Sequence, residues 1–441
     1  MYISTFLEGN SKLGRTPQSD FLRNYLTELN AESIVVEDQY IDKDYLIDYC
    51  NFHARSFNDY GKYTTRLHFF SKKFTQEEFE TKFLTTDFQI ELQDSYLGFV
   101  VVKPIDYKCE HNFIGRTILK TYDPKTYNKE TKRKEMRHYT TFEYPVSLYG
   151  IPLKIYSLQF QAQDSIVAAY ATTSIWTSLH ALNKLFGIQN QSPSEITKIA
   201  TSTIGYDRNF PSVSLDILQM KKYFDFIGLE TESIYVASYE GAKLIPDIIK
   251  AFLSFKLPII ACMCLEKKDK NGRSIKEGHA VVVSGYRSDD DGNISRIYVH
   301  DDGICPYSSV KRVDGDKSFL CWDNEWKAKG YERMQLVRFL IPLYPKIRLS
   351  FNRIYGKYSQ IREKNNKKNY LTTLSLVEIN KYKEELLDIN RKFEDKVTIL
   401  LKPMPKYNWL IRVETKDKLI ADYIVDATSM FPSVTKIKYV Q

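Results

Sequence analysis

The sequence predicts an α+β protein made of three consecutive regions, which cover residues 1–144, 145–312 and 313–441. Apolar residues at helical spacing and short β-branched runs alternate along the chain, so both helices and strands are expected. In the middle region one long helical stretch precedes three apolar runs, which indicates a central helix beside a sheet. With 441 residues, the chain also exceeds the usual size of a single domain. The two outer regions are expected to be α/β units that flank this centre.

The first region mixes both element types. Residues 21–29 have apolar side chains at helical spacing, and residues 33–37 form a short β-branched run. Residues 74–83 are mostly polar with spaced Phe, which predicts a second helix. The apolar run 96–103 predicts a buried strand, and the basic stretch 122–138 predicts an exposed loop or hairpin.

The middle region opens with a predicted helix over residues 163–186, capped by Asp164 or Ser165 and ended by Gly187. A second helix is expected over residues 215–226. Three successive strands are predicted, at 258–265, 279–286 and 294–300, with a turn over 289–293 between the last two.

The last region is predicted to begin with a strand over residues 336–344. Residues 361–369 are charged and resemble a linker, whereas residues 377–393 have helical spacing. Short apolar runs predict the strands of a small terminal unit at 397–401, 409–413 and 420–425.

The composition narrows the class of protein. Hydrophobic residues make up 43% and charged residues 27% of the chain, which is a globular balance. The net charge of +8 is mild for this length, so nucleic acid is not an expected partner. Six cysteines at unrelated spacings favour a reducing compartment over a disulfide scaffold.

No segment is expected to cross a membrane. The chain start lacks a basic stretch followed by a long apolar run, and the most apolar stretch, residues 244–265, contains lysines and prolines. We therefore expect a cytoplasmic protein. Cys262 and Cys264 share one strand face, but no second pair of ligands accompanies them, so neither a metal nor another cofactor is expected.

Three features of the middle region belong together chemically. Gln161 and Gln163 come directly before or at the start of the predicted helix, His279 opens an apolar strand, and Asp301 closes the next one. Asp301 lies 22 residues after His279 (301 − 279), and a tight turn between the two strands would bring their side chains together.

This arrangement suits thiol hydrolysis. A nucleophile at a helix N-terminus has its anion stabilised by the helix dipole. A histidine on a facing strand removes the proton, and an acid fixes the tautomer of that histidine. A glutamine shortly before the nucleophile can donate a hydrogen bond to an oxyanion.

The middle region resembles the papain-like cysteine peptidases, and within them the branch related to bacteriocin-leader-processing peptidases. The resemblance is carried, in the family's order, by the segments FQAQDSIVAAYATTSIW, GHAVVVSGYR and YVHDDG. It implies a papain-like fold, with a central helix against an antiparallel sheet, in a bacterial protein. It also implies that Gln163, His279 and Asp301 occupy the oxyanion, base and orienting positions.

The nucleophile position departs from the family pattern. Counting back from Trp176 places the expected Cys at position 170, where this chain has Tyr170. A phenol has a pKa of about 10 and is a poor nucleophile toward amides at neutral pH. Gln163 precedes position 170 by seven residues (170 − 163), one more than the family's usual spacing, so Gln161 stays open as the alternative oxyanion residue.

Three neighbouring residues have other interpretations. Asp302 is the alternative partner of His279, and Cys305 follows closely enough to be a displaced nucleophile. Strand alternation points His300 away from Asp301, so His300 is expected to be structural.

The sequence therefore predicts a catalytically impaired cysteine-peptidase homologue, a pseudopeptidase that binds a peptide or protein in an inherited cleft. The alternative is an active cysteine-type hydrolase, an effector in a bacterial stress or defence system, or its inactivated variant. A third hypothesis is a basic module whose loops contact nucleic acid, but no recognisable motif supports it. The sequence specifies neither the substrate nor the oligomeric state.

Overall fold

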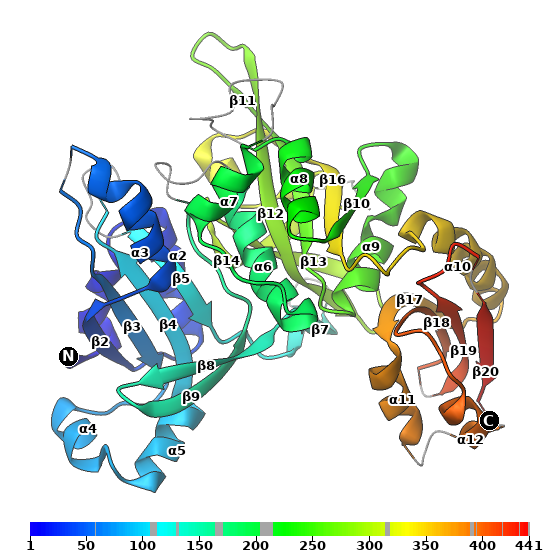
Figure 1. Ribbon diagram of the computed structural model, residues 1–441, viewed down its shortest axis with the longest axis horizontal. Helices are drawn as coiled ribbons and strands as arrows, with labels where there is room; N and C mark the ends of the chain where they lie inside the picture. The colour runs from blue at the N-terminus through cyan, green and yellow to red at the C-terminus, as the bar shows by residue number, and fades with distance from the viewer. Residues whose placement is uncertain are drawn as a thin grey trace.

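The computed structural model describes residues 1–57, 59–105, 113–128, 132–163, 171–202, 215–313, 318–388, 392–393, 395–416, 418–431 and 433–439. The chain combines helices with antiparallel sheets, which confirms the predicted α+β class. Figure 1 shows an N-terminal, a central and a C-terminal unit in a row along the longest axis. Within the described residues, none of the helices has the length and apolar character needed to cross a membrane.

The N-terminal unit is an antiparallel sheet packed with helices. Its strands are β1 (Tyr2–Thr5), β2 (Ser33–Tyr40), β3 (Thr64–Phe70), β4 (Tyr96–Lys103) and β5 (Phe113–Leu119), and its helices are α1 (Phe6–Gly9), α2 (Pro17–Glu28), α3 (Lys43–Asn51), α4 (Gln76–Lys82) and α5 (Thr86–Ser95). The strands pair in the order β1-β2-β3-β4-β5. Alternate residues of β4 enter two separate apolar clusters, which explains why this strand is buried along its whole length.

The central unit is a larger antiparallel sheet. Its strands are β10 (Glu230–Tyr235), β11 (Ile259–Lys268), β12 (Ser274–Asp289), β13 (Ile294–Asp301), β14 (Cys305–Arg312), β15 (Trp322–Asp323) and β16 (Arg333–Leu343), paired in the order β10-β16-β11-β12-β13-β14-β15. The hairpin of β6 (Lys125–Asn128) and β7 (Arg133–Tyr139) joins this sheet because β7 also pairs with β12. The central sheet thus includes strands that come before and after residues 145–312 in the sequence. The division of the chain into three domains remains a prediction.

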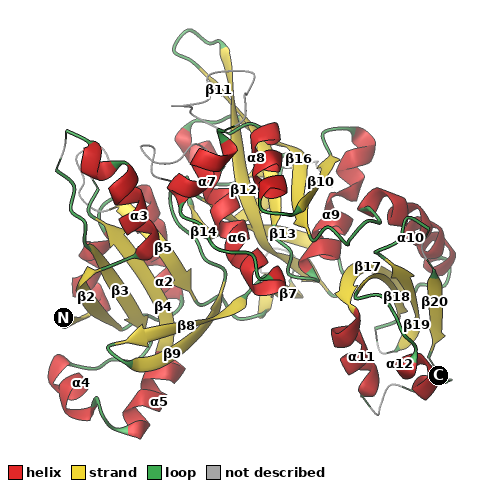
Figure 2. Cartoon of the chain, viewed as in Figure 1, coloured by secondary structure: helices red, strands yellow, loops and turns green. Residues whose placement is uncertain are grey.

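Four helices of the described chain accompany the central sheet, and a hairpin connects it to the N-terminal unit (Figure 2). The helices are α6 (Thr172–Phe186), α7 (Pro193–Ala200), α8 (Ile217–Phe226) and α9 (Tyr239–Leu253), and the hairpin is β8 (Phe142–Leu148) with β9 (Ile151–Ser157). Helix α6 lies against β11 and β12. It is buried from Thr172 to Leu182, so it is the core helix of this unit.

The C-terminal unit is a small antiparallel sheet of order β17-β18-β19-β20 with three helices among its described residues. Its elements are α10 (Phe351–Asn366), β17 (Leu371–Glu378), α11 (Ile379–Leu387), α12 (Lys396–Leu401), β18 (Tyr407–Glu414), β19 (Leu419–Asp426) and β20 (Val434–Lys438). Strands β18 and β19 match the apolar runs predicted at 409–413 and 420–425.

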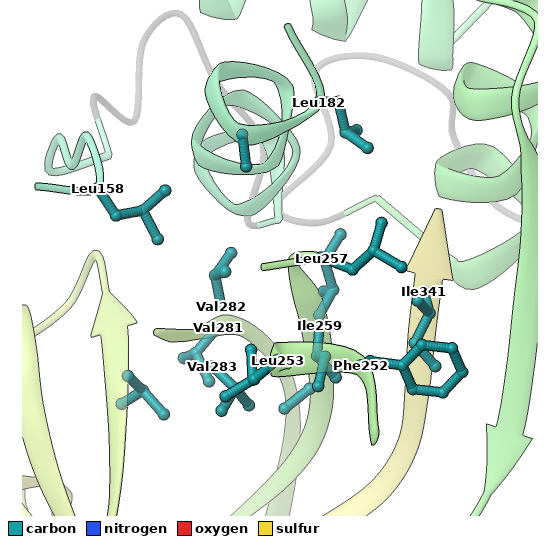
Figure 3. Packing of buried hydrophobic residues seen from close by; sticks show 14 of the residues in the cluster. Leu158, Leu182, Phe252, Leu253, Leu257, Ile259, Val281, Val282, Val283 and Ile341 are labelled. Atoms are coloured by element: carbon teal, nitrogen blue, oxygen red, sulfur yellow. The ribbon is translucent and has the colours of Figure 1, made fainter. Parts of the chain in front are cut away.

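The core of the central unit lies between α6, α9 and the middle of the sheet. Figure 3 shows Leu182 gathered with Leu257, Ile259 and the three consecutive valines 281–283 of β12. Leu182, Leu257, Ile259 and Val282 are fully buried. Burying a side chain of this size stabilises the fold by about 1.5–3 kcal/mol relative to leaving it exposed.

Four predicted elements differ from the structure. The helix predicted over 377–393 is limited to α11 (Ile379–Leu387), because residues 377–378 end β17 and Phe393 forms an isolated β-bridge with Tyr439. The helix predicted over 163–186 begins at Thr172, because Ala171 has a left-handed backbone (φ 81°) that a continuous helix cannot contain; its predicted caps lie at 164–165, outside the described residues. The expected linker 361–369 largely belongs to α10, whose buried Phe351, Ile354 and Tyr358 precede it. The strand predicted at 397–401 is helix α12.

Candidate functional site

The N-terminal end of α6 is hydrogen-bonded to β12 at the point where the apolar part of this strand begins. The Ser174 hydroxyl donates a hydrogen bond to the Ala280 carbonyl oxygen over 2.7 Å, and both residues are buried. Ala280 directly follows His279, so the first turn of α6 lies beside this histidine. The positive end of a helix dipole is worth about half a unit charge, and Thr173 in this first turn lies near the buried Asp302.

His279 and Asp301 form a hydrogen-bonded pair across two neighbouring strands. The Nε2 atom of His279 lies 3.0 Å from Oδ1 of Asp301, and the two side chains are only 5% and 1% exposed. The antiparallel pairing of β12 with β13 brings them together, since Val282 lies opposite His300. Because Nε2 makes this contact, Nδ1 is the ring nitrogen that a nucleophile would have to reach.

Both oxygens of the Asp301 carboxylate are held by further donors. The backbone N–H of Gly303 donates to Oδ1 over 3.0 Å, and the indole Nε1–H of Trp326 donates to Oδ2 over 2.7 Å. With His279, these donors satisfy an ionised carboxylate away from water, which would otherwise be costly. The carboxylate is therefore fixed in one orientation, and it fixes the imidazole in turn.

Trp326 also covers the histidine. Its ring packs edge-on against His279, with centroids 4.9 Å apart and an interplanar angle of 68°. On this ring lies the ammonium of Lys329, 4.5 Å from the centroid, and Lys329 donates to the Gly303 carbonyl oxygen as well. A Cβ atom at Gly303 would lie 2.6 Å from the ring of Trp326, so only glycine leaves room for it.

The electrostatics of the pair favour its charged form. Burial alone would lower the pKa of His279, but the negative charge and hydrogen bond of Asp301 raise it above the ordinary value of 6.5. Burial likewise works to raise the pKa of Asp301, and the facing imidazolium reverses this, so the pKa is lowered. The pair therefore exists as an imidazolium and a carboxylate at mildly acidic pH.

Asp302 is the second acid of the site. Its Oδ1 lies 3.8 Å from Nε2 of His279, and Thr173 of α6 lies near its carboxyl group. Burial raises the pKa of Asp302, and the negative charge of Asp301 raises it further. Asp302 is thus the weaker partner of His279, while Asp301 makes the short hydrogen bond.

His279, Asp301 and Asp302 each offer a ligand atom within 4.8 Å of the others, so the fit of a metal ion can be judged. A metal would need lone pairs that point at a shared centre. Nε2 of His279 instead faces Asp301 at hydrogen-bonding distance, and both oxygens of Asp301 already accept hydrogen bonds. The geometry fits a proton-transfer pair better than a metal centre.

The remaining residues of the expected site are only partly placed. Tyr170 lies outside the described residues, so its position relative to His279 stays a prediction. Gln163 is half-buried and precedes α6 without belonging to it. Gln161 is buried, and Lys103 donates to its Oε1 over 3.4 Å. The Nε2 donor of Gln161 has no hydrogen-bond partner among the described residues.

The two buried cysteines of the described chain, Cys262 and Cys305, offer no activated thiol. Cys305 is fully buried, and its thiol donates to the Gln18 carbonyl oxygen over 3.3 Å. Burial and the nearby Asp301 charge raise its pKa well above the ordinary value. Burial raises the pKa of Cys262 to about 12. Neither thiol provides the thiolate that a cysteine peptidase needs.

His300 lies in the core, away from the pair. Its ring packs edge-on against Tyr307, with centroids 4.6 Å apart, and against Phe160, with centroids 5.7 Å apart. Burial lowers the pKa of His300 to about 3, so this imidazole is neutral at ordinary pH. Its environment is that of a packing residue.

Sequence reasoning missed Trp326 and Gly303, which complete the site. Trp326 was included in the C-terminal region, although it lies in the 3-10 helix Glu325–Lys329 between β15 and β16 of the central sheet. The pair of tryptophans in CWDNEW, shortly after the HDDG segment, is the one local signal that indicates a packed aromatic contact nearby. No protein-family model matches the chain, and no curated protein sequence matches it either.

Proposed function

We propose that the chain is a catalytically impaired homologue of the papain-like cysteine peptidases, which binds a peptide or a protein segment beside His279. The observation that carries the proposal is the buried His279–Asp301 pair, with Nε2 of His279 3.0 Å from Oδ1 of Asp301. Such a pair is what a thiol hydrolase needs to take up and return a proton.

Two further observations support the peptidase-like interpretation. The pair lies next to the N-terminal end of α6, which is where a nucleophile would gain from the helix dipole. The oxygen of Asp301 that does not face His279 is held by Trp326, so the orientation of the imidazole does not depend on a bound ligand. These features favour a preformed site.

The residue at the nucleophile position argues against catalysis. Tyr170 replaces the expected thiol with a phenol whose ordinary pKa is about 10. Cys305 is buried with a raised pKa, so it is no substitute nucleophile. A site that keeps its base but not its nucleophile would act through binding, which makes a peptide or protein the expected partner.

The second candidate is an active hydrolase that uses another nucleophile. It is favoured by the fully hydrogen-bonded state of Asp301, which keeps His279 oriented as in an active enzyme. The two candidates separate in one assay, in which the full chain is incubated with a mixed peptide library and the products are read by mass spectrometry. We expect no cleavage. Cleavage that disappears in His279→Gln would establish the hydrolase instead.

Binding is tested with a substitution that blocks the site without disturbing the core. Glu277 lies two residues before His279 on β12, so both side chains lie on the same face of the strand, and the Glu277 side chain is 42% exposed. Glu240 on α9 is likewise an exposed glutamate paired with a lysine, so Glu240→Arg is the matched control for Glu277→Arg.

Peptides selected from a random library on the full chain are then synthesised and measured by fluorescence polarisation. We expect Glu277→Arg to weaken their binding at least about tenfold, which corresponds to about 1.4 kcal/mol, while Glu240→Arg binds like the unmodified chain. Equal binding by both variants, or a selection that enriches no peptide, contradicts the proposal.

A further inference from the structure

A cavity of about 760 Å³ lies where the central and C-terminal units meet, apart from the His279 site. It is lined by the end of α6, by the segment between β16 and α10, and by the segment leading into β18. The residues that define its chemistry are Phe186, Tyr344, Lys346, Arg348, Lys406 and Tyr407. Ligand pockets usually measure about 300–1,000 Å³, so this cavity is large enough for a drug-sized molecule.

Aromatic rings form one wall of the cavity. The centroids of Phe186 and Tyr344 are 5.5 Å apart, and those of Tyr344 and Tyr407 are 5.8 Å apart. Phe186 and Tyr344 are only half-buried, which leaves part of each ring accessible. Such a wall offers a flat ring, for example a nucleic acid base, a surface on which to stack.

The charged residues that line this cavity are all basic. Lys346 and Arg348 are exposed, and no acidic side chain of the described chain lies within ion-pair distance of either. Lys406 is loosely paired with Glu378, at 3.7 Å. The cavity therefore presents uncompensated positive charge beside its aromatic wall.

The two unpaired cations belong to a segment held in place by backbone hydrogen bonds. Exposed Lys346 and Arg348 alternate with buried Ile347 and Leu349. The N–H groups of Arg348 and Leu349 both donate to the Ala427 carbonyl oxygen, over 2.8 and 2.9 Å. Both cations are thus presented on the same side of an ordered segment, which lowers the entropy cost of binding a ligand.

One feature opposes an anion here. The cavity adjoins the C-terminal end of α6, where the helix dipole contributes about half a negative charge. Lys346 and Arg348 alone contribute two unpaired positive charges, so the cations outweigh the dipole.

We infer that this cavity binds a nucleotide, with the base on the aromatic wall and the phosphates on Lys346 and Arg348. A nucleotide joins a flat ring to a polyanion in one molecule, which is the combination that this lining complements. The inference is independent of the proposed peptide-binding site, since none of these residues belongs to it.

The test uses the full chain and an ATP analogue that carries an N-methylanthraniloyl fluorophore on the ribose. Binding is followed by fluorescence anisotropy at about 0.15 M salt, with ATP, adenosine, inorganic tripolyphosphate and poly-glutamate as competitors. We expect ATP to compete at least about tenfold better than adenosine or tripolyphosphate, because each of these lacks one half of the ligand.

The matched variants separate the cavity from general surface charge. Lys346→Ala with Arg348→Ala should weaken binding at least about tenfold, whereas Lys368→Ala, at an exposed lysine outside the cavity, should leave it unchanged. Four results would each overturn the inference: no saturable binding up to about 1 mM analogue, competition by tripolyphosphate as strong as by ATP, stronger competition by poly-glutamate, or equal binding by the two variants.

Discussion

The indole ring of Trp326 lies edge-on against the imidazole of His279, with centroids 4.9 Å apart, and both rings hydrogen-bond to the carboxylate of Asp301. One carboxylate thus positions two aromatic groups that come from segments far apart in the chain. This relationship makes the site a rigid assembly, and it determines how the site responds to pH and to substitution.

The first prediction concerns the titration of His279. Asp301 raises the pKa of His279 above 6.5, whereas burial alone would lower it. Asp301→Asn removes the negative charge that opposes the effect of burial, so the pKa of His279 should fall. A ¹H–¹³C NMR titration of the imidazole in both proteins measures the change. An unchanged pKa in Asp301→Asn would mean that the two groups do not interact in solution.

The same pair should make stability depend on pH. A raised histidine pKa adds stability below the unfolded-state value near 6.5, and this stability is lost as the pH rises through the folded-state pKa. The lowered pKa of Asp301 adds stability above its ordinary value of 3.8, and this is lost as the pH falls through the folded-state pKa.

Breaking a buried ion pair costs about 3–5 kcal/mol. The unfolding free energy of Asp301→Asn should therefore fall furthest below that of the unmodified chain near pH 5–6. Urea unfolding at about pH 5.5 and about pH 9 tests this, and the difference between the two proteins should be smaller at the higher pH. A difference that grows toward high pH would contradict the assigned charge states.

The second prediction concerns Cys305. Its raised pKa and its hydrogen bond to Gln18 should make it unreactive in the folded protein. With iodoacetamide at neutral pH, Cys50 is exposed and should be alkylated first, whereas Cys305 should react only after unfolding. Peptide mapping measures both rates in one sample. Alkylation of Cys305 as fast as that of Cys50 would reinstate it as a displaced nucleophile.

The third prediction uses Gly303. A methyl group there would lie 2.6 Å from the ring of Trp326, so Gly303→Ala must push the indole away from Asp301. Overpacking of this kind costs about 1–3 kcal/mol. The matched control is Gly356→Ala in α10, which has open surroundings and should gain up to about 1 kcal/mol from helix propensity. If both substitutions change the unfolding free energy equally, the packing at Gly303 is not as described.

The local sequence pattern was sufficient to predict elements that have the same environment along their whole length. Strand β4 coincides with the apolar run 96–103, because a strand that is buried on both faces consists mainly of consecutive apolar residues. Strands β11, β12 and β13 were predicted in order, and so was the meeting of His279 with Asp301. That meeting follows from two neighbouring strands joined by a tight turn, which is a local relationship.

The predictions that were wrong or missing depend on features that the local sequence pattern does not contain. No property of an alanine indicates a left-handed backbone, so the start of α6 after Ala171 could not be predicted locally. Residues 361–366 look like a linker when read alone, but they extend a helix whose apolar stripe lies earlier, and Arg362 pairs with Asp247 on α9. The contact of Trp326 with His279 depends on the path of β14, β15 and β16, which composition does not encode.

The most direct test of the account is the reactivity of a thiol placed at position 170. If Tyr170 occupies the nucleophile position of a papain-like site, the cysteine of Tyr170→Cys should be activated by His279 and the dipole of α6. Thiols in such surroundings have pKa values of about 3.5–7.5 instead of about 8.5. At about pH 6 the variant should therefore react with iodoacetamide much faster than the exposed Cys50, measured by peptide mapping. Adding His279→Gln should remove most of that excess. A cysteine at position 170 that reacts no faster than Cys50, and that does not respond to His279→Gln, would contradict the proposed relationship to the papain-like peptidases.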